Sequence, residues 1–227
     1  SFWFDTLDEP SAIERSDALP SEVDVAIIGA GYTGLWTAYY LKEKDPLLDI
    51  AVFEANTVGF GASGRNGGWC MGLAWGIDGM LADEKRRDAG VRLLRAMHDT
   101  VDEVGRVSQR EGIECHFAKG GTLEVAIVPF HVKDMQEDMA HHHQLGFSED
   151  DYRWLPAEEA RERVGMTPNY GATYTPHCAV LHPARLVKGL GRVVRAKGVK
   201  IHEATPVTEM ASGYVDTDKG RVSAAKI

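Results

Sequence analysis

A glycine-rich turn between an apolar segment and an amphipathic segment constrains this chain more than any other feature. Residues 23–28 are mostly apolar, as is typical of a buried parallel strand, and Gly-Ala-Gly-Tyr-Thr-Gly follows directly at 29–34. Apolar residues then recur at helical spacing over 33–44, and a second apolar run at 50–53 ends at Glu54. The whole segment has the length of one βαβ unit.

Each glycine of this turn has its own physical role in a dinucleotide site. Gly29 permits a tight turn, Gly31 lets a pyrophosphate approach the backbone, and Gly34 lets the helix pack closely on the strand. The start of the helix supplies free N–H groups and a partial positive charge for the phosphates. A strand-to-helix turn that binds nothing has the same local pattern. Because the glycines lie directly between strand and helix, the sequence favours a dinucleotide.

Glu54 lies at the end of the second strand, 20 residues after Gly34. An acid at this place accepts hydrogen bonds from the adenosine ribose hydroxyls and repels a 2'-phosphate. Taken alone, Glu54 has the pattern of a surface acid on a loop. Together with the glycine turn, it is predicted to be a ribose ligand.

A second glycine-rich segment, Gly-Phe-Gly-Ala-Ser-Gly-Arg-Asn-Gly-Gly at 59–68, favours FAD over NAD. Five glycines in ten residues let a backbone pass very close to another group. Ser63, Arg65 and Asn66 add a hydroxyl, a cation and an amide, which suit a pyrophosphate and the edge of a flavin ring. A flexible surface loop is the alternative interpretation. A GxSxG nucleophile elbow is excluded because Arg65 stands where glycine is needed.

These motifs together resemble the D-amino-acid oxidase superfamily of FAD-dependent oxidoreductases, in particular its gamma-glutamylputrescine oxidase-like branch. The resemblance rests on Val-Ala-Ile-Ile-Gly-Ala-Gly-Tyr-Thr-Gly-Leu from Val25, on Glu54-Ala55, and on Gly-Ala-Ser-Gly-Arg-Asn-Gly-Gly from Gly61. Supporting matches lie at 120–123, 182–187 and 205–207, so the resemblance covers nearly the whole chain.

The resemblance implies FAD as cofactor and a set of residues that hold it. The turn and Glu54 should bind the ADP half, the 63–68 segment should lie along the pyrophosphate, ribityl chain and ring, and the backbone of Val207 should face the adenine. The implied cofactor-binding residues are Gly29, Gly31, Tyr32, Thr33, Gly34, Glu54, Ala55, Gly61, Ala62, Ser63, Arg65, Asn66, Gly67, Gly68 and Val207. Trp69 and Cys70 either approach the isoalloxazine or belong to the core.

The resemblance also implies a reaction, in which the C–N bond of an amine or amino acid is oxidised by hydride transfer to flavin N5 and the imine hydrolyses. It assigns no catalytic residue, and oxygen or another acceptor would reoxidise the flavin. Two other functions remain open. A NAD-dependent dehydrogenase would leave the 59–68 segment without a role, and a non-catalytic flavin-binding subunit would need a partner chain.

The expected fold is α/β, with a Rossmann-like FAD-binding domain of the GR2 type interrupted by part of a mixed α+β substrate domain. We expect an irregular arm at 1–19, the FAD domain at 20–111 and 175–227, and the partial substrate domain at 112–174. The periodicity predicts helices at 81–110, 132–144, 156–164 and 183–197, and strands at 123–127, 200–203, 207–210, 214–218 and 221–227.

Relatives in this superfamily continue well beyond such a segment, so we expect an N-terminal portion: a fragment or incomplete record, one subunit of a split enzyme, or the ordered part of a longer protein. The last strand, 221–227, is expected to leave an open sheet edge.

The composition limits the classes of partner and the compartment that we expect for this chain. The net charge of −9 argues against nucleic acid and anionic membranes, and no apolar run has the roughly 20 residues of a membrane span. The start has no pattern of a secretory signal, and three distant cysteines without CxxC spacing favour a reducing cytoplasm over a disulfide framework or a zinc site. The histidines at 141–143 are expected to lie on a solvated helix face and to bind no metal, and His177 is a weak candidate for facing the substrate.

Overall fold

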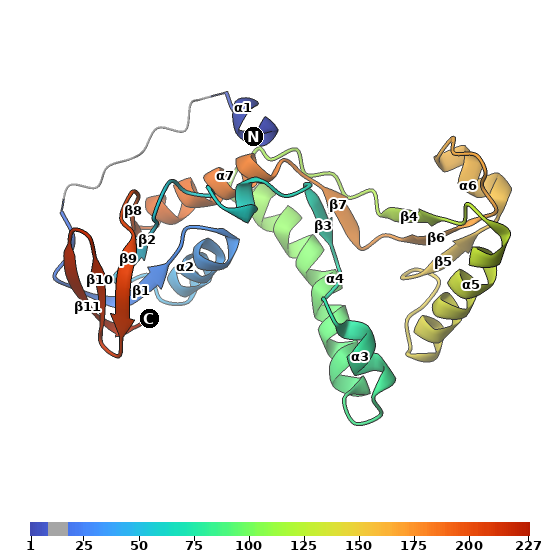
Figure 1. Ribbon diagram of the computed structural model, residues 1–227, viewed down its shortest axis with the longest axis horizontal. Coiled ribbons are helices and arrows are strands. Elements are labelled where there is room, and N and C mark those ends of the chain that lie inside the picture. Colours follow the sequence, from blue (N-terminus) through green and yellow to red (C-terminus); the bar gives the residue numbers. More distant parts are fainter. Residues whose placement is uncertain (9–17) are drawn as a thin grey trace. The chain divides into compact units, whose positions relative to one another are not determined.

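A computed structural model describes residues 1–8 and 18–227, which form two compact units (Figure 1). The first unit comprises 1–68, 108–116 and 182–227 of the described chain, and the second comprises 69–107 and 117–181. These limits differ from the expected domain ranges, because residues 69–107 group with the second unit. The difference arises because Ile77, Leu81 and Leu94 form one hydrophobic cluster with Phe147 of the second unit. Strand β3 (Trp69–Met71) pairs with β7 (Cys178–Val180), and both strands belong to this unit.

The first unit is built on a six-stranded sheet of order β8-β2-β1-β11-β10-β9. The parallel part contains β8 (Lys200–His202), β2 (Ile50–Phe53), β1 (Glu22–Ile28) and β11 (Gly220–Lys226). Strands β9 (Val207–Ala211), β10 (Tyr214–Thr217) and β11 follow one another as an antiparallel meander. The predicted strands at 23–28, 50–53, 200–203, 207–210, 214–218 and 221–227 are all confirmed within one or two residues.

The expectation that the last strand forms an open edge is wrong. Strand β11 lies between β1 and β10, with Glu22 opposite Ser223 and Val25 opposite Lys226. Its other side pairs with β10, where Val215 faces Val222. The edges of this sheet are therefore β8 and β9, and β11 is an interior strand with partners on both sides.

Two main helices of the first unit pack together, α2 (Tyr32–Lys44) and α7 (Pro183–Ala196). Both match the predicted helices closely. An ionic and hydrogen-bonded network joins them to the end of α4: Tyr39 donates to Glu111 at 2.7 Å, and Lys197 pairs with Glu43 at 2.7 Å. The expected irregular arm also contains a helical turn, α1 (Phe2–Asp5), and residues 9–17 of that arm lie outside the described residues.

The second unit contains a three-stranded antiparallel sheet of order β4-β6-β5. Its strands are β4 (Thr122–Val125), β6 (Ala172–Thr175) and β5 (Arg153–Leu155), of which only β4 was predicted. Helices α5 (Pro129–Gln144) and α6 (Ala157–Arg163) confirm two predicted helices. Strands of three or four residues carry too little alternation to be recognised from sequence.

The single helix predicted at 81–110 is two helices, α3 (Ile77–Ala82) and α4 (Arg87–Arg110). Asp83 separates them. Its carboxylate accepts the backbone N–H of Lys85 at 2.9 Å and the Nε–H of Arg86 at 2.8 Å. An aspartate that binds the backbone two residues ahead favours a turn over a continuing helix.

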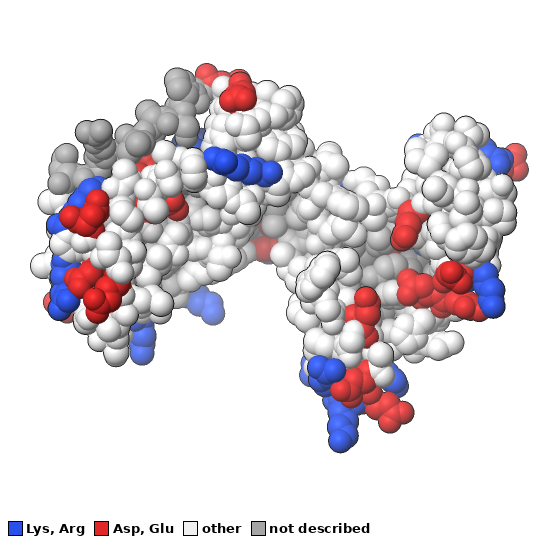
Figure 2. All heavy atoms as spheres, in the orientation of Figure 1, with Lys and Arg blue, Asp and Glu red and all other residues white. Residues whose placement is uncertain are grey.

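Charged side chains of both signs lie close together on the face shown in Figure 2. The ion pairs of the described residues include Arg221 with Asp216 and Arg86 with Asp83. Among the helices in the described part of the chain, none combines the length and apolar character that a membrane crossing requires.

Candidate dinucleotide-binding site

The glycine turn is held between the ends of β1 and β2. Gly29 has a φ of 95°, which favours glycine, and its N–H donates to Phe53 O at 2.8 Å. Gly34 lies so close to this turn that an added Cβ would stand 2.1 Å from Gly29 O. The predicted strand–turn–helix arrangement is therefore present, with the start of α2 directly beside the turn.

Glu54 follows β2 and faces the glycine turn. Its N–H donates to His202 O on the neighbouring strand at 3.0 Å, which fixes its backbone. Its carboxylate accepts the N–H of Ala30 at 2.8 Å and the N–H of Asn56 at 2.9 Å. A carboxylate has about four acceptor positions, so two bonds leave capacity for ribose hydroxyls. The sequence did not reveal the bond from Glu54 to the turn itself.

Ser63 joins the second glycine-rich segment to the first. It lies in the short 3-10 helix η1 (Ala62–Gly64), and its Oγ accepts the N–H of Tyr32 at 2.9 Å. An added Cβ at Gly31 would stand 2.9 Å from the same hydroxyl oxygen. The two glycine-rich segments, about 30 residues apart in sequence, therefore meet at the amino end of α2.

Asn66 and Arg65 have contacts inside the second segment. The amide of Asn66 donates to Ser63 O at 3.0 Å and accepts the N–H of Gly68 at 2.9 Å, so this side chain holds the loop together. The guanidinium of Arg65 lies 4.3 Å from the centre of the Phe60 ring and remains exposed. Arg65 thus places a cation on the outer side of the loop.

These residues fit the pyrophosphate and ribose of a dinucleotide. Gly31 stands at the N-cap of α2 and has no side chain to cap the helix, so first-turn N–H groups other than that of Tyr32 suit an anion. An added Cβ at Gly29, Gly61 or Gly67 would meet no described atom within 4 Å, which leaves room above the backbone. Gly68, in contrast, is buried.

Val207 begins β9 at the far edge of the sheet, and it is half-buried. The connection before it contacts the segment of Glu54, because Thr205 N–H donates to Glu54 O at 2.8 Å and Ala204 N–H donates to Asn56 O at 2.8 Å. Val207 is therefore two residues beyond a direct contact with Glu54.

Glu203 is a site residue that sequence reasoning missed. Its side chain is 2% exposed, accepts the N–H of Val58 at 2.6 Å, and lies 3.8 Å from Arg195. It therefore anchors the backbone between Glu54 and the second glycine-rich segment. The available signal was an acidic residue at the end of a short predicted strand, two residues before Thr205-Pro206.

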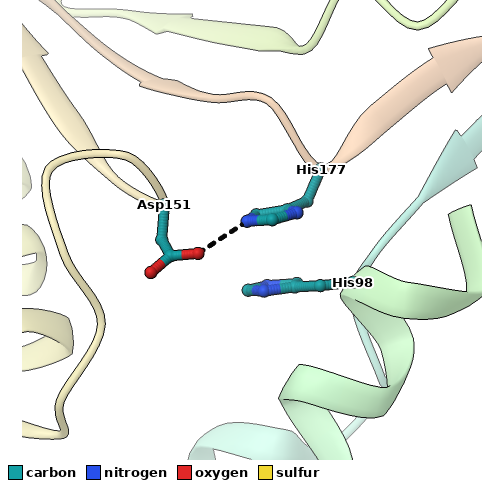
Figure 3. A group of neighbouring side chains, drawn as sticks. All are labelled: His98, Asp151 and His177. Atoms are coloured by element: carbon teal, nitrogen blue, oxygen red, sulfur yellow. Dashed lines mark hydrogen bonds and ion pairs between the residues drawn. The ribbon is translucent and has the colours of Figure 1, made fainter. Parts of the chain in front are cut away.

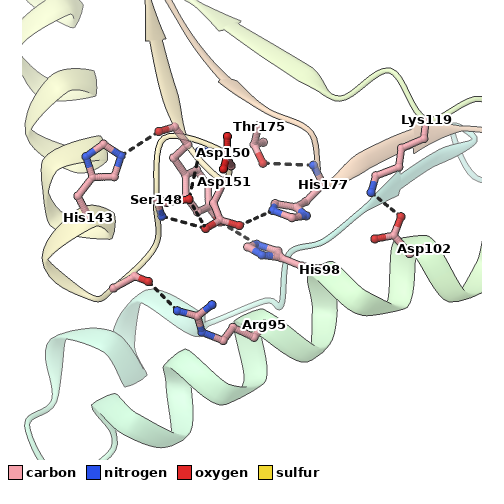
Figure 4. A network of polar contacts seen from close by, with 12 residues as sticks. Arg95, His98, Asp102, Lys119, His143, Ser148, Asp150, Asp151, Thr175 and His177 are labelled. Carbon is pink, nitrogen blue, oxygen red and sulfur yellow. Dashed lines mark hydrogen bonds and ion pairs between the residues drawn. The ribbon is translucent and has the colours of Figure 1, made fainter.

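A second polar cluster lies within the other unit and contains His98, Asp151 and His177 (Figure 3). The two imidazoles are stacked 3.6 Å apart at an angle of 4°, and His177 Nε2 lies 2.9 Å from Asp151. His98 Nε2 lies 2.9 Å from the hydroxyl of Tyr152. Ser148 N–H donates to Asp151 at 2.9 Å and orients its carboxylate (Figure 4).

The ligand atoms of this cluster lie within 4.8 Å of one another, as in a metal site. However, the lone pair of an imidazole nitrogen lies in the plane of its ring. In two parallel stacked rings these lone pairs do not converge on one ion, and both Nε2 atoms have protein partners. Burial lowers the pKa of His98 to about 4, so its ring is neutral. We interpret the cluster as a hydrogen-bonded part of the interior.

The expectation of a solvated face at 141–143 is wrong for two of the three histidines. The His142 side chain is 15% exposed and its ring centre lies 4.3 Å from that of Tyr152. His143 Nε2 lies 2.9 Å from Tyr152 O. Tyr152 covers this side of α5, which the helix pattern alone does not show.

Of the two residues that follow the glycine-rich loop, Trp69 is 61% exposed and Cys70 is partly buried within this unit.

Comparisons with known proteins show the family and the fold of this chain. A family model described as FAD dependent oxidoreductase (DAO) matches residues 24–227. The chain is 30% identical to gamma-glutamylputrescine oxidoreductase of Escherichia coli (strain K12) over 208 residues, which are 88% of this chain and 47% of that protein. The chain thus spans about half the length of the curated relatives it matches.

Solved structures show the same fold. The L-amino acid deaminase from Proteus myxofaciens, in complex with anthranilate, has a TM-score of 0.76 at 22% identity, covering 96% of this chain and 47% of that one. Glycine oxidase from Bacillus cereus ATCC 14579 has a TM-score of 0.70 at 21% identity, covering 90% of this chain and 53% of that one.

Proposed function

Because the chain belongs to the DAO family of FAD-dependent oxidoreductases, we propose that its two glycine-rich segments hold FAD for the oxidation of an amine or amino acid. The observation that carries the proposal is the 2.9 Å hydrogen bond from Tyr32 N–H to Ser63 Oγ. It brings the segment at 59–68 to the amino end of α2, where the pyrophosphate would bind. A simple NAD site needs only the glycine turn at 29–34 there, so the second segment favours FAD. In this proposal the first unit binds FAD and the second unit contributes to the substrate domain.

The residues of this chain would bind and orient the cofactor. The first-turn N–H groups of α2 and the Arg65 cation would offset the pyrophosphate charge, while Glu54 would accept the ribose hydroxyls. The backbone at Val207 would face the adenine. Bound FAD would supply an oxidant whose N5 takes a hydride from the carbon next to the substrate nitrogen, while that nitrogen gives up a proton to water. That carbon–nitrogen bond becomes an imine, and water then converts it to a carbonyl product and a free amine or ammonia.

The names of the relatives support a proposal for the substrate class. They are named gamma-glutamylputrescine oxidoreductase, L-amino acid deaminase and glycine oxidase. Each of these names refers to a compound with an amine nitrogen. We propose the same class here, an amine or amino acid.

Anaerobic bleaching of the flavin tests the reaction. The protein is loaded with FAD, freed of oxygen and mixed with a broad panel of amines and amino acids. At least one compound is expected to bleach the visible flavin bands and to yield a carbonyl product. A 2-hydroxy acid panel serves as the control. Stable flavin absorbance across the whole amine panel would contradict the proposed activity while leaving FAD binding intact.

Glu54→Gln is expected to raise the dissociation constant for FAD. The change removes the charge that strengthens the ribose hydrogen bonds, and a bond to a charged group contributes about 1.5–3 kcal/mol, or roughly 10- to 100-fold in affinity. Fluorescence titration of apoprotein with FAD measures the constant. Glu124→Gln, at an exposed position of β4, is the matched control. An unchanged constant for Glu54→Gln would remove Glu54 from the proposed site.

A further inference from the structure

The helical turn α1 packs against the second glycine-rich segment within the first unit. The contact is tight at Gly64, where an added Cβ would stand 2.6 Å from Cζ of Phe4. The same Phe4 ring lies 5.9 Å from the guanidinium carbon of Arg65, on which Phe60 also packs at 4.3 Å. The Phe4 ring therefore contacts the residue that follows Ser63, the side chain that joins the loop to α2.

A second contact ties α1 to the amino end of α7. Trp3 meets the ring of His182 edge to face with centres 4.9 Å apart, and Thr6 Oγ1 lies 3.0 Å from His182 Nε2. His182 is 7% exposed and caps α7, because its Nδ1 accepts the N–H of Arg185 at 3.2 Å. With Nδ1 as acceptor in the neutral ring, Nε2 carries the proton and donates to Thr6.

Both contacts are linked to the proposed phosphate site through Tyr32 and Ser63. The first residue of α7, Pro183, accepts the hydroxyl of Tyr32 at 3.0 Å, and Tyr32 N–H donates to Ser63. Just beyond α1, Asp8 pairs with Arg185 at 2.9 Å. Thus α1 is connected through His182 and Pro183 to Tyr32, and through Phe4 and Gly64 to the neighbour of Ser63.

We propose that α1 is a clamp that holds residues 60–65 in the conformation that binds FAD. This inference rests on the proposed FAD site. A loop with so many glycines loses much backbone entropy when a ligand orders it. The aromatic side chains of α1 order the loop before FAD binds. The loop therefore loses less backbone entropy on binding, and the affinity for FAD is higher. Phe4 and Trp3 are positioning residues in this account, because they act through Gly64 and His182.

Phe4→Ala and Trp3→Ala are the variants that test the clamp. Each is expected to raise the FAD dissociation constant about 10-fold, since a preorganised loop contributes on the order of one decade in affinity. Phe130→Ala removes an aromatic ring that is 69% exposed and belongs to the other unit, so it is the control and should leave the constant unchanged. Thr6→Val removes only the hydroxyl facing His182 and provides a milder variant should an aromatic substitution prevent folding.

Limited trypsin digestion without FAD provides an independent readout. Arg65 is an exposed cleavage point inside the clamped segment, so cutting after Arg65 is expected to be several times faster in both α1 variants than in Phe130→Ala. Unchanged FAD affinity together with an unchanged cleavage rate would overturn the clamp. If the unaltered protein fails to bind FAD, the proposed site is wrong, and the cleavage rate alone then decides whether α1 orders the loop.

Discussion

Replacing Gly34 with valine is expected to abolish retention of FAD and to lower the free energy of unfolding by about 3 kcal/mol. The cause is steric. A Cβ at this position would stand 2.1 Å from Gly29 O and 3.1 Å from Cγ2 of Ile27. The turn cannot withdraw without cost, because Gly29 N–H is bonded to Phe53 O. Helix α2 must therefore move away from β1, and the first-turn N–H groups move with it.

Urea unfolding and the flavin content after gel filtration measure the two effects. Gly79→Ala in α3 is the matched control, because an added Cβ there meets no described atom within 4 Å, and alanine favours a helix by about 1 kcal/mol over glycine. This control should retain FAD and full stability. A Gly34→Val protein that keeps both would show that close packing of α2 on the turn is unnecessary for the site.

Acidification is expected to destabilise α4 and its surroundings through His98. Burial, with a further contribution from neighbouring His177, lowers the pKa of His98 from its usual 6.5 to about 4. The unfolded chain therefore binds one more proton between these values. The stabilising contribution is fully present above pH 6.5 and is lost progressively as the pH falls towards 4, by about 2 to 3 kcal/mol.

Hydrogen exchange of the α4 amides at pH 7 and at pH 4.5, corrected for the intrinsic exchange rate, measures this local stability. His98→Gln retains polar groups for Tyr152 and is expected to show little change between the two values of pH. Burial also lowers the pKa of His182 and His202 in the first unit, which is why a local probe in α4 is needed. Equal pH dependence in the variant and the unaltered protein would assign the effect to another group.

The parts of the fold that the sequence predicted are those set by local patterns. The turn at 29–34 and its flanking strand and helix combine glycine spacing with apolar periodicity, so their positions are correct within a residue or two. Helix α7 was equally clear, because proline marks its start and Gly198 follows its end. The second glycine-rich segment was recognised from its five glycines in ten residues, and the family resemblance added the expected roles of its residues in binding FAD.

The parts that sequence analysis missed depend on contacts between distant segments. The bond from Tyr32 to Ser63 and the burial of Glu203 arise only when the loop folds back on α2. The place of β11 between β1 and β10 depends on strand order, which periodicity does not contain. The stacked pair of His98 and His177 likewise brings together α4 and the segment before β7. Such contacts require the tertiary structure, because no local pattern specifies them.

The most direct test of FAD binding is reconstitution of the purified chain with excess FAD, followed by gel filtration, a visible absorption spectrum and mass analysis of the ligand released on denaturation. We expect flavin bands that elute with the protein and a released mass equal to that of FAD, both lost in Gly34→Val. A folded protein that stays colourless after reconstitution, or one that retains a nicotinamide dinucleotide in preference to FAD, would contradict this expectation.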